Sequence, residues 1–166
     1  MIELSPEEVR NVVKQFWGHY GNKGDEYKAL IHDDIEIVMP EADFGNPLGR
    51  PIKGKQAFLG VMEADYDAVP DFNMNIKRIL VDGQTAIVEC IQEGKDMTGF
   101  VKAFGGNADN LPADGVKIRS AFVFELKDGK IYKTFAYYDL FNFMVVQLGL
   151  DVNQVMMLKA GTDAFA

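Results

Sequence analysis

The sequence predicts an α+β fold in which a curved antiparallel sheet packs on three helices. Helical patterns fill most of residues 5–69, and strand patterns fill most of residues 72–138. A run of helices followed by a run of strands is typical of this fold class. The clearest strand signal is a hairpin at 117–138, where two aromatic-rich segments flank the turn Asp128-Gly129. An Asp-Gly pair between alternating apolar residues strongly favours a tight antiparallel turn.

The first helix is the best marked element. Ser5 and Glu8 form an S-x-x-E capping box, and Pro6 occupies the first helical position. Apolar residues then recur at spacings of three and four as far as residue 20, which predicts one broad apolar stripe. The segment 21–24 contains two glycines and ends the helix.

Two more helices and five strands complete the expected order. The helices fit residues 25–31 and 54–69, and Pro70 stops the second of them. Strands are predicted at 35–39, 72–82, 85–92, 117–126 and 131–138. The segments 41–53 and 98–115, rich in Gly and Pro or marked by a Gly-Gly pair, are expected to be loops. Residues 151–158 are expected to form a last helix or arm.

Size and charge restrict the class of protein. A chain of 166 residues is the length of one domain, so we expect residues 1–166 to form a single domain. The net charge of −8 argues against a nucleic-acid partner, because phosphate binding needs a basic face. It also argues against binding to an anionic membrane.

The chain shows no signal for export or membrane insertion. Its first eight residues carry three acidic side chains, unlike a secretory leader, and no apolar run approaches the ~20 residues of a membrane span. The single cysteine, Cys90, cannot form a disulfide framework and is expected to be a buried, inert thiol. We therefore expect a cytoplasmic protein.

Several short segments carry a family resemblance. They are Ile31-His-Asp-Asp-Ile35, Lys53-Gly-Lys-Gln-Ala57, Val69-Pro-Asp71, the Asp-Gly turns, and the tail 139–149 with its terminal Gln-Leu-Gly. In this order and spacing, roughly from Val9 to Gly149, the chain resembles the SnoaL-like polyketide cyclases. These belong to the superfamily named after nuclear transport factor two, together with ketosteroid isomerase, scytalone dehydratase and limonene epoxide hydrolase.

The resemblance implies a cone-shaped fold, described for this superfamily as a cystatin-like α+β barrel, with a cavity between helices and sheet. It also implies a homodimer formed through the outer sheet face. By strand alternation that face carries Arg119, Ala121, Val123, Phe135 and Tyr137. The aspartate that follows the last strand, Asp139, is expected to cap the short helix after it.

The positions at which the resembled enzymes carry acids, bases and donors hold other residues here. The acid on the last strand is replaced by Ala136, and the base that precedes a proline after the first strand is replaced by Met39. The tyrosine donor of the isomerase matches Phe16. The remaining polar positions of the cyclases, the isomerase and the epoxide hydrolase fall near Phe122, Cys90 and Gln92.

Strand alternation predicts an apolar cavity lining with a few neutral polar groups. The expected substrate-binding residues are Phe16, Trp17, Met39, Met62, Cys90, Gln92, Ser120, Phe122, Thr134, Ala136 and Tyr138. Such a lining suits a flat hydrophobic ligand of polyketide, steroid or terpenoid type. The alternative is that these side chains form an ordinary hydrophobic core.

Acid–base chemistry next to a carbonyl needs a base and a donor for the enolate oxygen. Glu41 and Asp43, just after Pro40, are the candidate bases, and Tyr20 and His19 on the first helix are the candidate donors. The alternatives are a solvated acidic loop and the polar edge of an amphipathic helix. Two histidines and one cysteine match no metal-ligand spacing, so we expect neither a metal nor a cofactor.

Three functions follow from this reading. The first is a cofactor-independent enzyme that cyclises, isomerises or dehydrates a small hydrophobic carbonyl compound. The second is a protein that binds such a compound without turnover, in which Gln92, Ser120, Thr134 and Tyr138 orient the ligand. The third is a protein-interaction adaptor that uses the sheet face.

Overall fold

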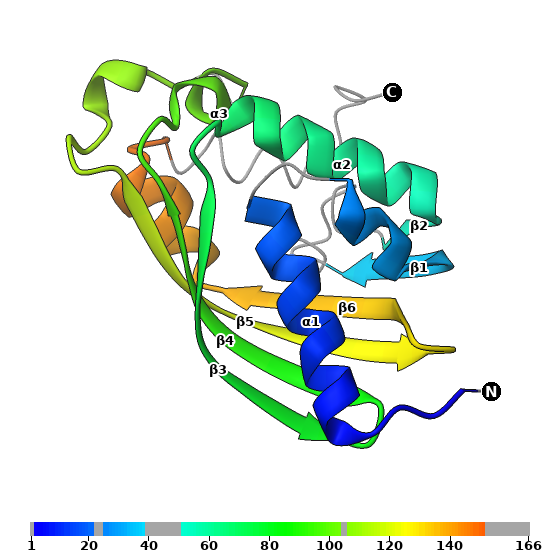
Figure 1. Cartoon of the computed structure of the whole chain (residues 1–166). Helices are drawn as coiled ribbons and strands as arrows, with labels where there is room; N and C mark the ends of the chain where they lie inside the picture. Colours follow the sequence, from blue (N-terminus) through cyan, green and yellow to red (C-terminus); the bar gives the residue numbers. More distant parts are fainter. Residues whose placement is uncertain (1, 22–24, 39–50, 104–105, 152–166) are drawn as a thin grey trace.

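The computed structural model describes residues 2–21, 25–38, 51–103 and 106–151. Six strands form one strongly curved sheet, and the helices α1 and α2 lie on its concave side (Figure 1). The sheet does not close into a barrel, because β2 lies at one edge and β3 at the other. The predicted α+β class and the curved sheet on helices are therefore confirmed.

The strand order across the sheet is β2-β1-β6-β5-β4-β3. The strands are β1 (Ile31–Val38), β2 (Ile52–Lys53), β3 (Asn73–Asp82), β4 (Thr85–Gly94), β5 (Val116–Lys127) and β6 (Lys130–Tyr138). All neighbouring pairs are antiparallel except β1 and β6, which run parallel. The strands β3 to β6 form a meander joined by the predicted turns, and β1 extends it beside β6.

The first helix, α1 (Pro6–Gly21), begins with the capping box that the sequence predicts. Ser5 donates its backbone N–H to the Glu8 carboxylate at 2.7 Å, and its hydroxyl lies 2.6 Å from the same oxygen. This contact lowers the pKa of the Glu8 carboxyl. The second helix, α2 (Lys55–Ala68), agrees with the predicted boundaries, and the third, α3, spans Thr98–Ala103.

The structure differs from the sequence expectation in four segments of the chain. β1 begins at Ile31 rather than at Ile35, and its register against β6 shifts between Ile31 and Glu36, so a bulge interrupts the alternation. The segment expected as the second helix is the 3-10 helix η1 (Glu26–Leu30). Two segments expected as loops contain structure: β2 lies in the first, and α3 and the 3-10 helix η4 (Ala108–Asn110) lie in the second.

The short helix after β6 is the π-helix η5 (Asn142–Gln147). The Asp139 Oδ1 atom accepts a hydrogen bond from the Asn142 N–H at 2.9 Å, so the predicted capping role of Asp139 is confirmed. Of the segment 151–158, expected as a last helix or arm, only residue 151 lies within the described residues.

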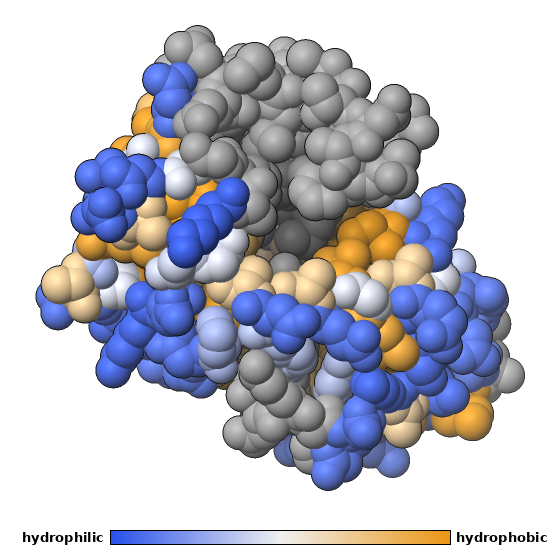
Figure 2. Space-filling view, turned by 90° about the horizontal axis from the view of Figure 1, so that it is seen from above, coloured by the Kyte–Doolittle hydropathy of each residue, from blue (hydrophilic) through white to orange (hydrophobic). Residues whose placement is uncertain are grey.

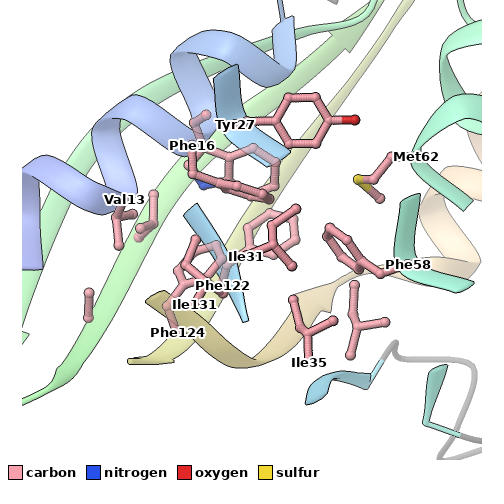
Figure 3. Close-up of a cluster of buried hydrophobic side chains, with 14 of the residues drawn as sticks. Val13, Phe16, Tyr27, Ile31, Ile35, Phe58, Met62, Phe122, Phe124 and Ile131 are labelled. Atoms are coloured by element: carbon pink, nitrogen blue, oxygen red, sulfur yellow. The ribbon is translucent and has the colours of Figure 1, made fainter. Parts of the chain in front are cut away.

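Two clusters of buried apolar side chains hold the elements together. The larger lies between α1, α2 and the concave face of the sheet, where Phe16, Phe58, Met62, Phe122 and Phe124 gather (Figure 3). The second joins α3 and η5 to the start of β5, and its buried members are Val69, Met97, Val101, Val116, Phe143, Met144, Leu148 and Leu150. Burial in this second cluster explains why a six-residue helix forms at α3 although its local sequence does not predict a helix.

Within the described residues, none of the helices has both the length and the apolar character needed to cross a lipid bilayer.

Candidate functional site

A cavity of about 280 Å³ lies between the two apolar clusters. Its walls come from α1, α2, α3, η5 and residues of all six strands. Seen from above, the molecule shows hydrophobic residues gathered beside a hollow (Figure 2). The volume is near the lower end of the range of about 300–1,000 Å³ that small-molecule pockets usually have.

Aromatic side chains form much of the wall. The ring centroids of Trp17 and Phe122 are 4.9 Å apart, and those of Phe16 and Phe124 are 5.8 Å apart, both with edge-on geometry. Because these rings come from α1 and β5, they fix the helix against the sheet at the cavity. Phe58 and Met62 from α2 and Ile37 from β1 add further apolar surface.

Neutral polar side chains interrupt this apolar wall. Gln92 on β4 donates from Nε2 to the Ser120 hydroxyl on β5 at 2.6 Å, and Gln92 lines the cavity. Tyr138, at the end of β6, also lines it. Thr134 lines the cavity four residues earlier on the same strand, and its hydroxyl has no hydrogen-bond partner in the described structure.

Seven of the predicted substrate-binding residues line the cavity: Phe16, Trp17, Met62, Gln92, Phe122, Thr134 and Tyr138. Three others, Cys90, Ser120 and Ala136, are buried on the same sheet face without belonging to the lining. Burial, with a smaller contribution from Glu89, raises the pKa of the Cys90 thiol to about 12, which keeps it protonated and inert as expected.

The remaining predicted site residues lie outside what the structure describes. Met39, Glu41 and Asp43 fall in the segment 39–50, and the side chains of His19 and Tyr20 are likewise not described. The described residues on both sides of the segment 39–50 nevertheless lie at the cavity. Ile37, next to the end of β1, and Ile52, at the start of β2, both line it.

Strand alternation counted from Ala136 predicts that Thr134, Tyr138 and also Tyr132 face inward, and this is wrong for Tyr132. A register shift between β5 and β6 pairs Leu126 with Ile131, and these two are the buried residues. Tyr132 is instead partly exposed, with the Lys127 Nζ atom 4.9 Å from its ring centroid and the His32 ring packed edge-on against it. The bulge that reverses its direction has no local sequence signal beyond the neighbouring turn.

Sequence reasoning missed one wall of the cavity. Met97, Phe100, Val116, Phe143 and Met144 line it from α3 and the residue before it, the start of β5 and η5. The adjacent apolar residues Phe143 and Met144 indicated that the short helix after β6 has a buried side. In contrast, α3 lies in a segment for which Gly105-Gly106 and Pro112 predicted a loop. Only the packing of that segment against η5 shows that it faces the cavity; for example, the ring centroids of Phe100 and Phe143 are 5.3 Å apart.

Acidic groups are scarce in the described lining. Glu93 is its one carboxylate among the described residues, and alternation directs that side chain away from the face of Gln92. The Glu93 carboxylate lies 3.8 Å from the Lys117 Nζ atom. Nor do the described residues contain a group of three or more His, Cys, Asp or Glu side chains that could hold a metal ion.

A second and larger hollow, of about 820 Å³, lies between α1 and the edge strand β3. Four cationic side chains line it: Arg10, Lys14, Lys77 and Arg78. Arg10 is paired with Glu7 and Arg78 with Glu89, at 2.6 and 2.9 Å. Its charged lining does not suit a hydrophobic carbonyl compound, so we take the smaller, apolar cavity as the candidate site.

Comparison with known proteins identifies the family. A sequence profile of the SnoaL-like domain matches residues 13–134, which is most of the chain. This chain belongs to the SnoaL-like family. The resemblance drawn from the short sequence segments is thereby confirmed, whereas a search of curated proteins finds no match.

Solved structures share the fold at low sequence identity. IdmH, a proposed polyketide cyclase from Streptomyces antibioticus, is 20% identical, with a TM-score of 0.65 over 86% of this chain and 99% of that one. A proposed SnoaL-like polyketide cyclase from Jannaschia sp. CCS1 is 13% identical, with a TM-score of 0.66 over 91% of this chain and 100% of that one.

A third similar structure is TerC co-crystallised with polyporic acid. It is 13% identical, with a TM-score of 0.65 over 86% of this chain and 99% of that one. At such identities the likeness concerns the fold, and the activities of these proteins are not transferred by it.

Proposed function

We propose that this SnoaL-like protein is a cofactor-independent enzyme that cyclises, isomerises or dehydrates a small hydrophobic carbonyl compound in the cytoplasm. The observation that carries the proposal is the apolar, aromatic cavity of about 280 Å³, whose described lining includes the neutral polar side chains of Gln92, Thr134 and Tyr138. Such a wall holds a flat apolar body by contact and orients it by one or two hydrogen bonds. The co-crystal of TerC with polyporic acid supports a small organic ligand for a protein of this fold.

The base in this proposal is Glu41 or Asp43. Val38 ends β1 beside the cavity-lining Ile37. Glu41 follows Val38 by three residues, and an extended chain advances at most about 3.6 Å per residue, so chain length allows a separation of no more than about 11 Å. The proposal requires the carboxylate to reach a ligand at the β1 side of the cavity, which this bound permits.

The donor in this proposal is Tyr20 or His19. Tyr20 follows Phe16 by four residues and Trp17 by three, and both of those residues line the cavity. Positions three and four apart share one face of a helix. A hydroxyl or imidazole at the end of α1 would then stabilise the enolate oxygen formed when the base removes a proton.

Binding without turnover is the second candidate function, and a specific observation favours it. The described lining has no carboxylate directed into the cavity, and the position of the family's last-strand acid holds Ala136, which pairs with Phe122. In that case Gln92, Thr134 and Tyr138 would orient a carried metabolite.

One experiment separates the two functions. Polycyclic ketones, steroids, terpenoid epoxides and aromatic acids are screened by thermal shift, since a ligand at about 100 times its Kd stabilises by about 2.7 kcal/mol. Glu41→Gln, Asp43→Asn and the double variant are then compared with wild type for affinity and turnover of the binding class. Asp67→Asn, on the exposed surface of α2, is the control.

An enzyme loses turnover by about 10²–10⁴-fold in the responsible variant while its affinity stays within about threefold. Wild-type protein that binds tightly without converting any compound supports the carrier instead. If turnover and affinity are both unchanged in the double variant, Glu41 and Asp43 are not site residues. If no ligand class binds to the wild-type protein, the result favours the adaptor function.

We also propose a homodimer formed through the convex sheet face. Leu80, Ile87, Val123, Phe135 and Val38 are successive cross-strand partners on β3, β4, β5, β6 and β1. Leu80 is 51% exposed and Ile87 is 44% exposed, and Tyr137, two residues after Phe135 on β6, is 56% exposed. A continuous apolar row on the surface of a sheet favours burial against a second copy of itself.

A further inference from the structure

The Thr134 hydroxyl is a buried polar group without a partner. Thr134 is 3% exposed and lines the cavity, and among the described residues nothing accepts from or donates to its Oγ1 atom. Buried hydroxyl groups in folded proteins are nearly always hydrogen-bonded, because an unpaired one loses its bonds to water without replacement. The unpaired Thr134 hydroxyl therefore points to a partner supplied by whatever occupies the cavity.

The surroundings of Thr134 offer the hydroxyl no polar side chain in the sheet. Its cross-strand neighbours are Phe124 on β5 and Ile37 on β1, and both of these also line the cavity. The adjacent residues Lys133 and Phe135 lie on the opposite face, where the Lys133 Nζ atom is 5.7 Å from the Phe135 ring centroid. Alternation therefore directs Thr134 to the concave side, where the cavity lies.

The other polar end of the cavity is arranged differently. Gln92 and Ser120 bond to each other at 2.6 Å, so their hydrogen-bonding capacity is at least partly used within the protein. Ser120 is the cross-strand partner of Tyr138, which lies four residues after Thr134 on β6. Four residues of strand span roughly 13 Å, and the apolar pair Phe122 and Ala136 lies between the two ends.

We propose that Thr134 is a specificity-determining residue that selects ligands carrying a carbonyl or hydroxyl oxygen at one end of an apolar ring system. The ligand oxygen completes the missing hydrogen bond to Oγ1, at the usual O–H···O distance of about 2.7–2.8 Å. A hydroxyl both donates and accepts, so a ketone and a phenol satisfy it equally. The proposal rests on the proposed function in one respect, namely that the cavity takes a small hydrophobic compound.

The test uses pairs of ligands that differ by one oxygen. Affinities of 1-tetralone and tetralin, and of 2-naphthol and naphthalene, are measured for wild type, Thr134→Val and Thr134→Ser by calorimetry or by displacement of a fluorescent probe. Valine keeps the shape of threonine and removes the hydroxyl, whereas serine keeps the hydroxyl. Thr85→Val, on the partly buried start of β4 outside the cavity, is the matched control.

Wild type, Thr134→Ser and Thr85→Val should prefer the oxygenated member of each pair by about three- to tenfold, as expected for one net hydrogen bond. Thr134→Val should bind both members about equally. The preference must fall because the oxygenated ligand binds more weakly, while the affinity for the hydrocarbon stays within about twofold. If Thr134→Val keeps the full preference, the proposal is wrong although the cavity binds.

Stability without ligand gives a second readout. An unpartnered hydroxyl adds nothing to the folded state, so Thr134→Val should unfold at the same temperature as wild type or above it. A midpoint several degrees below those of Thr134→Ser and Thr85→Val would reveal an internal partner and overturn the proposal. If none of the four compounds binds to wild type, the proposed function fails for this ligand class, and the role of Thr134 fails with it.

Discussion

At the scale of single residues, glycines with left-handed backbone conformation fix the connections of the sheet. Gly115 precedes β5 with φ +77°, and a Cβ atom there would lie 2.5 Å from the Gly94 carbonyl oxygen and 2.7 Å from the Lys95 Cα atom. Gly83, in the turn between β3 and β4, has φ +55° and nothing within 4 Å of the corresponding position. The two sites share the conformation but differ in the space around it.

Gly115→Ala should therefore destabilise the protein more than Gly83→Ala. Both variants carry the left-handed strain of about 1–2 kcal/mol for a residue with a Cβ atom. In Gly115→Ala the chain at Gly94 and Lys95 must also move, which should raise the total to about 3 kcal/mol. Unfolding in urea measures both differences, and equal losses would mean that the contact at Gly115 relaxes without cost.

Contacts between residues near in sequence were predicted, whereas contacts between distant residues were not. The capping box of Ser5 and Glu8 and the cap at Asp139 were predicted, because each is a contact between residues three apart. The pairing of Gln92 with Ser120, 28 residues away, and the unpartnered hydroxyl of Thr134 were not. Both depend on which strands lie side by side, and local patterns do not determine that.

At the scale of elements, one carboxylate ties two connections together at the rim of the cavity. Asp71, between α2 and β3, accepts hydrogen bonds from the backbone N–H groups of Lys95 and Asp96 at 3.0–3.1 Å. Those two residues lead from β4 into α3. Val69 and Phe72 on one side and Met97 on the other line the cavity, so Asp71 holds two parts of its wall in place.

Asp71→Ala should loosen α3 before it affects the rest of the fold. Loss of the charged acceptor should cost about 1–2 kcal/mol, at the lower end for bonds to ionised groups because Asp71 is exposed. Hydrogen exchange should show reduced protection of the α3 amides with unchanged protection in α1. Asp71→Asn, which keeps one acceptor oxygen, should lie between, and Asp67→Ala on α2 serves as the control. Unchanged exchange in α3 would show that burial of Val101 alone holds this helix.

The same scale explains which elements were predicted. The sequences of α1, α2 and the meander β3–β6 have strong apolar periodicity together with caps or turn residues, so local sequence predicts each of them. The helix α3 is six residues long and β2 is two, and neither has enough length for a pattern. Burial in the second apolar cluster offsets the weak helix preference of α3. The pairing of Glu36 with Lys53 and of Ile37 with Ile52 stabilises β2.

At the scale of the whole molecule, the convex face decides whether the chain associates. The apolar row from Leu80 to Val38 crosses five strands, and the ion pair of Arg78 with Glu89 lies beside it on β3 and β4. The concave face is covered by α1 and α2, whereas no described helix covers the convex face (Figure 1). The proposed dimer would bury this row.

Ile87→Glu should convert a wild-type dimer into a monomer. Ile87 is 44% exposed, so a charge there is tolerated in the isolated chain but would be buried without a partner in a two-fold interface. Light scattering or sedimentation measures the mass across a range of concentrations, and Gln56→Glu on the exposed surface of α2 is the control. A wild-type protein that is monomeric at all concentrations would remove the dimer from the proposal.

The sequence by itself determined the α+β class, the meander with its turns, the helix caps and the family, because these depend on periodicity and on contacts between near neighbours. It also indicated an apolar cavity, since alternation sorts strand residues onto two faces. The tertiary structure decided the parallel pairing of β1 with β6, the outward turn of Tyr132 at a bulge, and the wall contributed by α3 and η5. These features arise from packing between segments far apart in the chain, whose energies no local window contains.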